Sequence, residues 1–530
     1  NRVGIGRSAP PHCLSVSEGA NGIIASFTNQ TNADFQINLT SGVTLLTPST
    51  GILALGTSNT ERFRISSDGS LSTPTAGTSN VNFGVNAGNS IASNAARNVC
   101  VGDEAGTAIN SGTDNVAIGF EALHDNTTGV GNVAIGFRAA DLSNASFSVA
   151  IGYNSLGANT SGDTNIGIGT NALGSNDEGG SNVAVGRDCL ITNSSGSNNI
   201  GMGRNALGSS TTASNNIAIG ASTGRFVTTA TNSTFVGTNA AKGVTGAKLT
   251  GSNNTAIGKD AGLVMQGSGA AANTIVGSGA ADALTVGANN TAVGYLALST
   301  TIDGAQNVAI GQQALGAADC GNGNTAIGCA ALNNTTAEFA TALGRDAGNS
   351  NTSGSNVTFL GKRAGMSGSP GGANTTGSNA VFIGDQSVGD AHIQVDWTVA
   401  SDQRDKTDFT ALDLGLDFVK ALAPVTYKWD KRAKYGDSEA ENYDITNYTP
   451  DGTHKEDWLD VGFKAQEVEV LEKAAGYKIA DKTNLVTSLT SDGKQYGMQY
   501  SKFIPILVKA IQEQNALIEA LTARIATLEG

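Results

Sequence analysis

The sequence predicts a mainly β protein: a β-solenoid shaft of about 17-residue rungs, followed by an α+β domain that ends in a parallel coiled-coil helix. Three observations support this prediction. A short apolar segment closed by Gly recurs from residue 81 to residue 384, and most spacings are 17 residues. Of the 31 Lys and Arg and the 45 Asp and Glu residues, 16 and 22 lie within residues 401–530, so the composition changes near residue 400. The last 30 residues carry apolar side chains at heptad spacing.

Residues 1–80 are predicted to form a β connector. Segments such as GIIASFTN, ADFQINLT, TLLTPSTGILALGT and ERFRISSDGSL alternate apolar and polar residues between turn residues, as short strands do. The phrases NRVGIGRSAP and ERFRISSDGSL resemble connector modules of phage fibres. Because the chain starts in the middle of such a motif, we expect it to be a piece of a longer protein.

Residues 81–390 are predicted to form the shaft. NVAIG occurs at Asn115–Gly119, and related segments recur along the region. A unit of 17 residues is too short to bury its own core, so neighbouring units must stack. Eighteen rungs at about 4.8 Å each would make a rod of roughly 85 Å. The closing glycines are Gly84, Gly102, Gly119, Gly136, Gly152, Gly169, Gly186, Gly203, Gly220, Gly237, Gly258, Gly277, Gly294, Gly311, Gly328, Gly344, Gly361 and Gly384.

Each unit has the same predicted parts. A triplet such as Val116-Ala117-Ile118 forms a short strand with alternating faces, and Gly supplies a turn or a close backbone approach. A small-apolar segment such as Glu121-Ala122-Leu123 follows, and Asn, Ser, Thr and Gly make the return loop. No Pro occurs between Pro74 and Pro370, as expected where stacked backbones hydrogen-bond. We expect inner faces of Ala, Val and Ile; such thin cores favour a parallel trimer.

The longer spacings, from Gly237 to Gly277 and from Gly361 to Gly384, predict loops that project from one side of the shaft. The repeats are similar to the head repeats of trimeric autotransporter adhesins, whose period is shorter.

Composition argues against several classes of function. The net charge is −14, which disfavours a nucleic-acid partner, and the apolar runs are too short for a membrane span. The five Cys have no metal-ligand spacing, so we interpret them as small buried side chains in a reducing cytoplasm. Fragments such as Gly258-Lys259 lack the strand–loop–helix context of a phosphate loop. We therefore expect no cofactor and no metal.

From Ser401 the sequence resembles the endosialidase-type intramolecular chaperone, an autocleaving domain at the end of many phage tail fibres and tail spikes. The ordered segments that carry the resemblance are SDQRDKTDF from Ser401, ALAPVTYKW (Ala421–Trp429), DVGFKAQEVEVL (Asp460–Leu471) and the segment Tyr500–Glu529. The resemblance implies an intramolecular chaperone over residues 401–530, after a junction at residues 391–400. It further implies self-cleavage between Ala400 and Ser401, with Ser401 as nucleophile and Lys406 as general base.

This chemistry is physically reasonable. A Ser hydroxyl is a weak nucleophile and needs a neighbour that accepts its proton. A Lys does so when burial or nearby cations lower its pKa. Arg404 is a candidate neighbour, whereas Asp402 and Asp405 oppose that shift unless they turn away. The alternative interpretation is a solvated loop with ordinary charges.

The last segment has a clear heptad. Ile504, Ile511, Ile518 and Ile525 are seven residues apart, and Leu507, Gln514, Leu521 and Leu528 fill the other seam position. This spacing predicts a parallel coiled coil over residues 500–529, but it does not by itself distinguish a trimer from a dimer. The trimer prediction depends on the resemblance and on the thin rungs.

These observations predict a structural subunit of a phage tail fibre or spike. We expect a homotrimer, made in the host cytoplasm and carried on the virion, that attaches to other virion proteins through a missing N-terminal part and binds a glycan or protein receptor on the host. Self-cleavage is the one enzymatic activity predicted. The alternatives are a bacterial trimeric adhesin and a glycan-cleaving tail spike. The first would need a membrane β-barrel, and the second would need paired carboxylates with aromatic platforms.

Overall fold

A computed structural model describes residues 53–57, 60–65, 71–73, 76–388, 391–394, 398–437, 443–490 and 492–530. The chain divides into two compact units, residues 1–71 and 72–530. In the first unit, β1 (Leu53–Thr57) and β2 (Thr60–Ile65) pair antiparallel, and β3 (Leu71–Ser72) lies at the unit boundary. The strands predicted before residue 53 lie outside the described residues.

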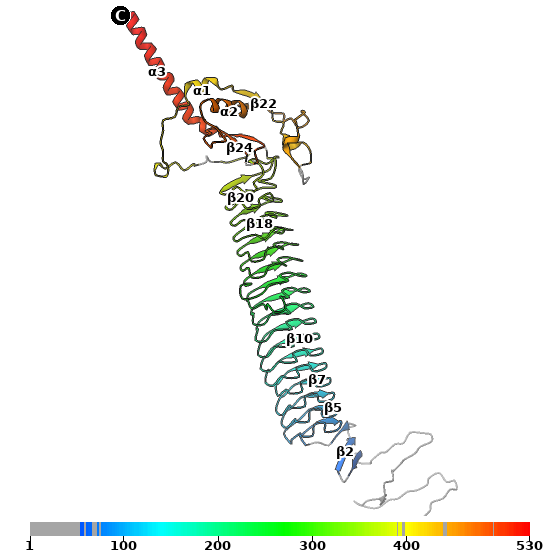
Figure 1. The fold of residues 1–530 in the computed structure, drawn as a ribbon. Helices are drawn as coiled ribbons and strands as arrows, with labels where there is room; N and C mark the ends of the chain where they lie inside the picture. The colour runs from blue at the N-terminus through cyan, green and yellow to red at the C-terminus, as the bar shows by residue number, and fades with distance from the viewer. Residues whose placement is uncertain are drawn as a thin grey trace, which may run out of the picture. The chain divides into compact units, whose positions relative to one another are not determined.

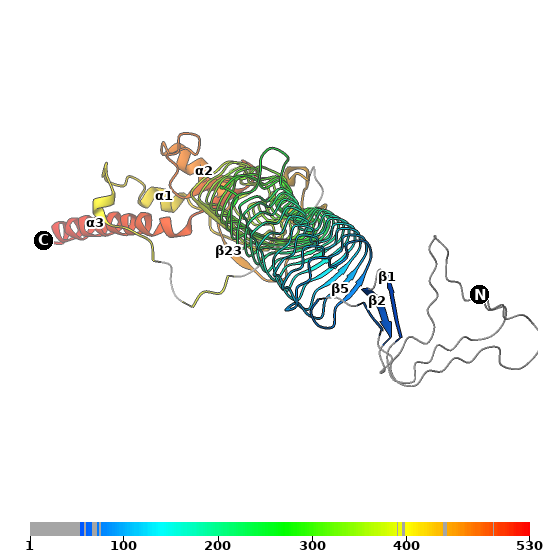
Figure 2. The same ribbon diagram turned by 90° about the horizontal axis from the view of Figure 1, so that it is seen from below.

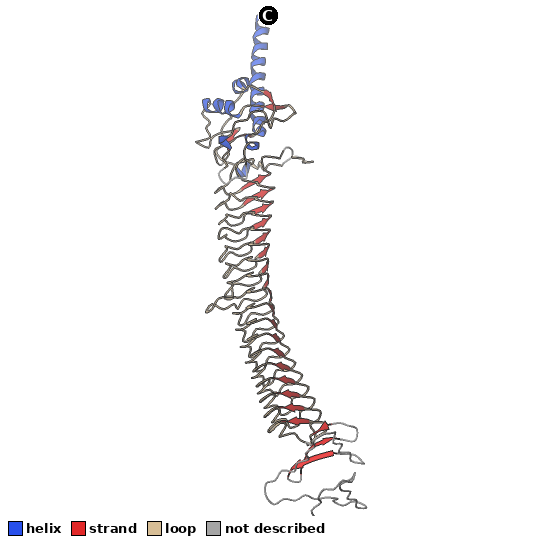
Figure 3. Cartoon of the chain, turned by 90° about the vertical axis from the view of Figure 1, so that its right-hand side faces the viewer, coloured by secondary structure: helices blue, strands red, loops and turns tan. Residues whose placement is uncertain are grey.

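The second unit begins with a stack of 18 short parallel strands, β4 to β21, which form the shaft (Figure 1). Each strand pairs in register with the strand one rung away, and Figure 3 shows the strands in a single column along one side. The predicted β-solenoid is therefore confirmed. The strands are β4 (Val81–Phe83), β5 (Val99–Val101), β6 (Val116–Ile118), β7 (Val133–Ile135), β8 (Val149–Ile151), β9 (Ile166–Ile168), β10 (Val183–Val185), β11 (Ile200–Met202), β12 (Ile217–Ile219), β13 (Thr234–Val236), β14 (Thr255–Ile257), β15 (Thr274–Val276), β16 (Thr291–Val293), β17 (Val308–Ile310), β18 (Thr325–Ile327), β19 (Thr341–Leu343), β20 (Val357–Leu360) and β21 (Ala380–Ile383).

The interior of the rungs is narrower than predicted. In β6 the central Ala117 is fully buried, whereas Val116 and Ile118 on either side lie on the outer face. The expected inner face of Ala, Val and Ile is therefore wrong for the flanking Val and Ile of this triplet, whereas the buried Ala117, and Ile275 at the centre of β15, agree with it. The central Ala117 lies in the same buried core as Ala122 and Leu123, and this narrow space suits a small side chain.

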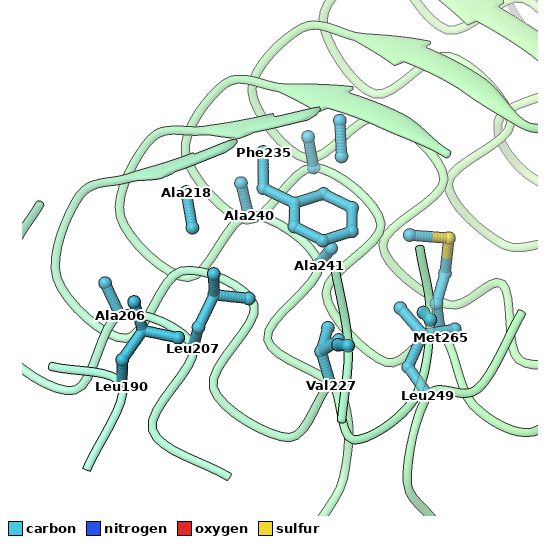
Figure 4. Close-up of a cluster of buried hydrophobic side chains, with 14 of the residues drawn as sticks. Leu190, Ala206, Leu207, Ala218, Val227, Phe235, Ala240, Ala241, Leu249 and Met265 are labelled. Carbon is cyan, nitrogen blue, oxygen red and sulfur yellow. The ribbon is translucent and has the colours of Figure 1, made fainter. Parts of the chain in front are cut away.

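Large central residues are accommodated by glycines opposite them. Phe235 is fully buried (Figure 4), and a Cβ on Gly224 would lie 3.1 Å from its ring. Phe359 similarly fills the space at Gly348 and Gly365, where a Cβ would lie 2.5 Å and 2.2 Å from its ring. The core thus stays close-packed because a large side chain at one position is matched by a glycine at a neighbouring position.

The closing glycines have a backbone conformation that other residues rarely adopt. Gly203 has φ = +134°, and a Cβ there would lie 2.5 Å from the carbonyl oxygen of Gly220. Four residues later, many rungs place a fully buried Leu in the left-handed region, as at Leu173 (φ = +53°). Such a residue is strained by about 1–2 kcal/mol, and burial of the Leu side chain offsets this strain.

A row of buried asparagines runs along the shaft directly before the strands. Asn115 donates its backbone N–H and its Nδ2 to Oδ1 of Asn98 at 3.1 Å each, and Nδ2 also donates to the Gly129 carbonyl at 2.9 Å. Ser148 and Ser233 replace Asn in two rungs. The other members of this asparagine ladder are Asn80, Asn132, Asn165, Asn182, Asn199, Asn216, Asn254, Asn273, Asn290, Asn307 and Asn324.

The rung between Gly237 and Gly258 contains an insertion. Val244 and Ala247 form an antiparallel bridge across a tight turn, and Leu249 then returns to the interior, where it bridges to Val227 and Gly267. Figure 2 shows one loop in the green part of the shaft projecting beyond the outline of the stacked rungs. The extra residues therefore leave the rung spacing unchanged.

The C-terminal region is a small α+β assembly. Its core consists of Leu414, Phe418, Val468, Val486, Phe503 and Ile506. Two antiparallel strand pairs, β22–β23 and β24–β25, pack with three helices. Its elements are η1 (Gln403–Asp405), α1 (Leu416–Ala421), β22 (Val425–Tyr427), η2 (Arg432–Lys434), η3 (Ile445–Asn447), β23 (Asp460–Gly462), α2 (Ala465–Ala474), β24 (Thr487–Leu489), β25 (Tyr496–Met498), η4 (Tyr500–Lys502) and α3 (Phe503–Glu529).

Candidate functional site

Ser401 and Lys406, the two residues predicted to carry the cleavage, are in direct contact. Lys406 Nζ donates to Ser401 Oγ at 2.6 Å and lies 3.3 Å from the Ser401 carbonyl oxygen. The short helix η1 lies between them, and the Lys406 N–H closes it by donating to the Gln403 carbonyl. This single helical turn brings two side chains five residues apart to the same place.

Asp402 and Arg404 form a separate pair beside this contact. Asp402 Oδ1 accepts from the Arg404 backbone N–H at 2.9 Å, and Asp402 Oδ2 lies 2.6 Å from Arg404 Nη2. The Arg404 guanidinium holds the pKa of Asp402 below its ordinary value, since hydrogen bonds to the carboxylate favour its charged form. Arg404 therefore pairs with Asp402. The sequence had suggested Arg404 as a neighbour of Lys406, and its guanidinium is instead directed at Asp402.

The Ser401–Lys406 contact has the arrangement required for proton transfer. A neutral Lys amine at 2.6 Å from a hydroxyl can accept its proton as the oxygen attacks a carbonyl carbon. The carbonyl of Ala400 is joined to Ser401 through the peptide bond, so the nucleophile is adjacent to the bond that would be cut. Ala400, Ser401 and Lys406 are all exposed in the single chain.

Two carboxylates that the sequence does not single out hold elements of the C-terminal domain together. Glu472 is fully buried and accepts the backbone N–H groups of Leu485, Val486 and Thr487 at 2.8, 2.7 and 3.1 Å. It thereby fixes β24 to α2. The sequence gives no signal for this role, because Glu472 has the spacing of an ordinary exposed helix charge.

Glu513 has a similar role at the start of α1. Its Oε2 accepts the Leu416 N–H at 2.7 Å, which satisfies a free donor of the first helical turn. A Cβ on Gly415 would meet the same carboxylate at 2.2 Å, so the Gly allows this close approach. Glu513 therefore joins α1 to α3.

Helix α3 leaves its heptad seam uncovered. Phe503, Ile506 and Ala510 are buried in the domain. The seam residues Ile511 and Ile518 lie on the remaining surface and are 64% and 51% exposed. The apolar heptad seam of α3 is therefore exposed in the single chain.

The shaft has a second uncovered apolar surface, formed by the outward residues of its strands. We call this surface the strand face: the first and third residues of each triplet, with Thr358 and Leu360 of β20 and Val381 and Ile383 of β21. Every one of these residues is Val, Ile, Leu, Met, Phe or Thr, and none is charged. Parallel sheets normally have both faces covered, whereas the strand face is exposed or half-buried in the single chain.

The described residues contain no cluster of three His, Cys, Asp or Glu residues that could hold a metal ion. In the same residues, no helix is long and apolar enough to cross a membrane.

Comparison with known proteins gives one match. Residues 401–477 match the family model described as chaperone of endosialidase. The matched segment begins at Ser401 and includes Lys406, α1, β22, β23 and α2, whereas α3 lies beyond it. No curated protein and no solved structure was found to match the chain.

Proposed function

We propose that the chain is a structural subunit of a phage tail fibre or spike, in which the C-terminal domain aligns three copies, starts their winding, and is then released by cleavage between Ala400 and Ser401. One observation carries the proposal. The match to the endosialidase chaperone family begins at Ser401, directly after an 18-strand solenoid, and its first residues place Lys406 against Ser401.

Two exposed apolar surfaces support a parallel homotrimer. The seam of α3 would bring copies together side by side and pointing in the same direction. The strand face runs along the whole shaft without a charge, so three parallel copies could bury it along their length. A narrow rung filled mainly by Ala gives each copy few large buried side chains of its own.

A chaperone is physically useful here because the rungs are so alike. Strand triplets such as those of β6, β7 and β8 have the same sequence, Val-Ala-Ile. A shift of one rung between copies would therefore cost little energy, as in other sheets whose register is weakly specified. A seed that forms first at one end would fix the register before winding.

The cleavage would proceed in two steps. In the first step Ser401 Oγ attacks the Ala400 carbonyl carbon and Lys406 accepts the hydroxyl proton. Lys406 then passes this proton to the Ser401 nitrogen as the C–N bond breaks, which leaves an ester and the free amino group of Ser401. In the second step water hydrolyses the ester. The shaft would then end at Ala400 with a carboxylate, and the released domain would begin at Ser401.

The experiment that tests the chaperone role compares two ways of removing residues 401–530. Deleting them from the gene should give monomers or aggregates, because nothing then fixes the register. Removing them by protease after assembly should leave a heat-resistant shaft, since an interwoven trimer unfolds slowly. The variant Ile518→Asp should behave like the gene deletion, because it places a charge in the seam. Normal soluble trimers from the deleted gene would refute the chaperone role.

A further inference from the structure

Charge is distributed along the shaft in segments. Residues 103–178 contain nine Asp and Glu residues but a single basic residue, Arg138. Residues 260–346 contain six acidic residues and one Arg. Between them, residues 187–259 reverse the balance, with six basic residues and one Asp. We call these six residues the basic band: Arg187, Arg204, Arg225, Lys242, Lys248 and Lys259.

The basic band lies on one side of the rungs, outside the strand face. Arg187, Arg204 and Lys259 each follow a closing glycine, so they share one column along the shaft. Arg225 and Lys242 occupy the fifth position after the closing glycine on successive rungs, and the Phe226 N–H donates to the Lys242 carbonyl at 2.9 Å.

Asp260 connects the two columns. Its carboxylate lies 3.1 Å from Lys259 Nζ. Burial raises the pKa of Asp260, but a hydrogen bond from Asn239 and the charges of Lys259 and Lys242 together hold it below its ordinary value. Asn239 Nδ2 donates to Asp260 Oδ1 at 2.9 Å, and the Lys242 N–H donates to the Asn239 carbonyl at 3.1 Å. Asn239 and Asp260 therefore connect the column of Lys242 to that of Lys259.

Most of the basic band is not neutralised. Within the described part of the chain, Arg204, Arg225, Lys242 and Lys248 have no carboxylate at ion-pairing distance. The Arg225 guanidinium instead lies over the Phe226 ring, 5.1 Å from its centroid. The turn at Val244–Ala247 lies between Lys242 and Lys248, so both lysines flank the insertion of this rung.

We propose that the basic band is a binding site for an anionic polysaccharide of the host cell surface, one that carries a carboxylate or phosphate on its repeating unit. The proposal rests on the function proposed above. The basic band extends over five rungs, or about 20 Å, which matches several units of an extended polymer. The acidic segments of the shaft before and after the basic band would repel such a polymer. The basic band would therefore also determine where along the shaft the polymer binds.

The test measures binding of the full-length protein to immobilised polymers at low and moderate salt. The probes are polygalacturonate for carboxylate, poly(glycerol phosphate) for phosphate, and neutral dextran as the control. Binding to at least one anionic probe should weaken as salt rises, because exposed charges are screened, and dextran should not bind. The anionic probe that binds more tightly identifies the group recognised.

A matched pair of variants places the site. The triple variant Arg204→Gln, Arg225→Gln and Lys242→Gln should bind the anionic probe about tenfold more weakly, since each exposed contact contributes a few-fold. The control Arg97→Gln, Arg138→Gln and Arg345→Gln removes the same charge outside the basic band and should change binding less than about twofold. Should the triple variant fail to assemble, Arg204→Gln alone replaces it, with a smaller loss expected.

Three binding results would overturn the proposal: equal binding by the two triple variants, binding that does not respond to salt, or tighter binding to duplex DNA than to either anionic probe. The proposal would also be overturned if the wild type formed larger assemblies that the basic-band variant did not form. Such assemblies would mean that the basic band binds the acidic rungs of another shaft. Sedimentation and cleavage of each variant, measured in parallel, show separately whether the proposed assembly function has failed.

Discussion

Lys406 Nζ lies 2.6 Å from Ser401 Oγ, and Ser401 is the residue at which the charged C-terminal region begins. The contact depends on a single turn of 3-10 helix whose first residue, Gln403, follows the capping residue Asp402. A hydroxyl, an amine and the Ala400–Ser401 peptide bond are thus contained within seven residues.

The first prediction concerns the roles of these two residues. Ser401→Ala should abolish cleavage while trimers still form, because the hydroxyl is lost and the fold is not. Lys406→Arg should also abolish cleavage, because a guanidinium keeps the charge but does not deprotonate in proteins. Gel electrophoresis of purified protein over time measures both, and cutting by Lys406→Arg would exclude Lys406 as the base.

The second prediction concerns the closing glycines. Gly203→Val should impair assembly of the shaft, because a β-branched residue at φ = +134° is strained and its Cβ would lie 2.5 Å from the Gly220 carbonyl oxygen. Gly208→Val is the matched control: its nearest neighbour would be 3.3 Å away, and Ile191 holds the equivalent position one rung earlier. The yield of soluble shaft is the measurement. Equal yields from both variants would contradict the assigned role of Gly203.

The third prediction concerns the asparagine ladder. Asn182→Ala removes the acceptor of two hydrogen bonds from Asn199 and the donor to the Gly196 carbonyl, at 2.8 Å. Each buried group left without a partner should cost about 1–3 kcal/mol. Asn182→Ser should cost less, because Ser148 and Ser233 already accept the same backbone N–H in their rungs.

The rate of unfolding in guanidinium compares the two Asn182 variants. We expect Asn182→Ala to unfold faster than Asn182→Ser, and Asn182→Ser to lie closer to the wild type. The same rate for Asn182→Ala and the wild type would show that the ladder adds nothing to the stability of the shaft.

The fourth prediction concerns the strand face. Ile217→Asp places a charge on this face, where Ile217 is 37% exposed in the single chain, and it should reduce the amount of trimer. Burying an unpaired carboxylate between copies costs several kcal/mol, roughly enough to prevent stable association. Ser195→Asp adds the same charge on an exposed loop and should assemble normally. Sedimentation compares the two variants. Equal trimer content would show that the strand face is not the interface between copies.

The rung architecture could be predicted because each triplet repeats at a nearly constant spacing with Gly at its end. Val116, Ala117 and Ile118 alternate faces as expected, but the direction of the alternation could not be foreseen. Ala and Val are both apolar, and the choice between them depends on how much space the rung encloses. That space is set by the returning chain at Ala122 and Leu123, whose left-handed Leu contradicts ordinary backbone preferences.

The asparagine ladder was hidden for a different reason. Asn is typical of turns and loops, and a residue such as Asn115 gives no local sign that it is buried. Its partners, Asn98 and Gly129, are 17 and 14 residues away and come within reach only when the rungs stack. The Ser401–Lys406 contact could be predicted because both residues belong to one short motif, whereas the pairing of Arg404 with Asp402 depended on rotamers that a sequence does not specify.

The most direct test of the account is the intact mass of the assembled protein, combined with N-terminal sequencing of any small fragment. The account predicts two products, a shaft that ends at Ala400 and a released domain that begins with the sequence SDQRDK at Ser401. A single product at the full mass of 53.3 kDa, or a small fragment with any other first residue, would contradict it.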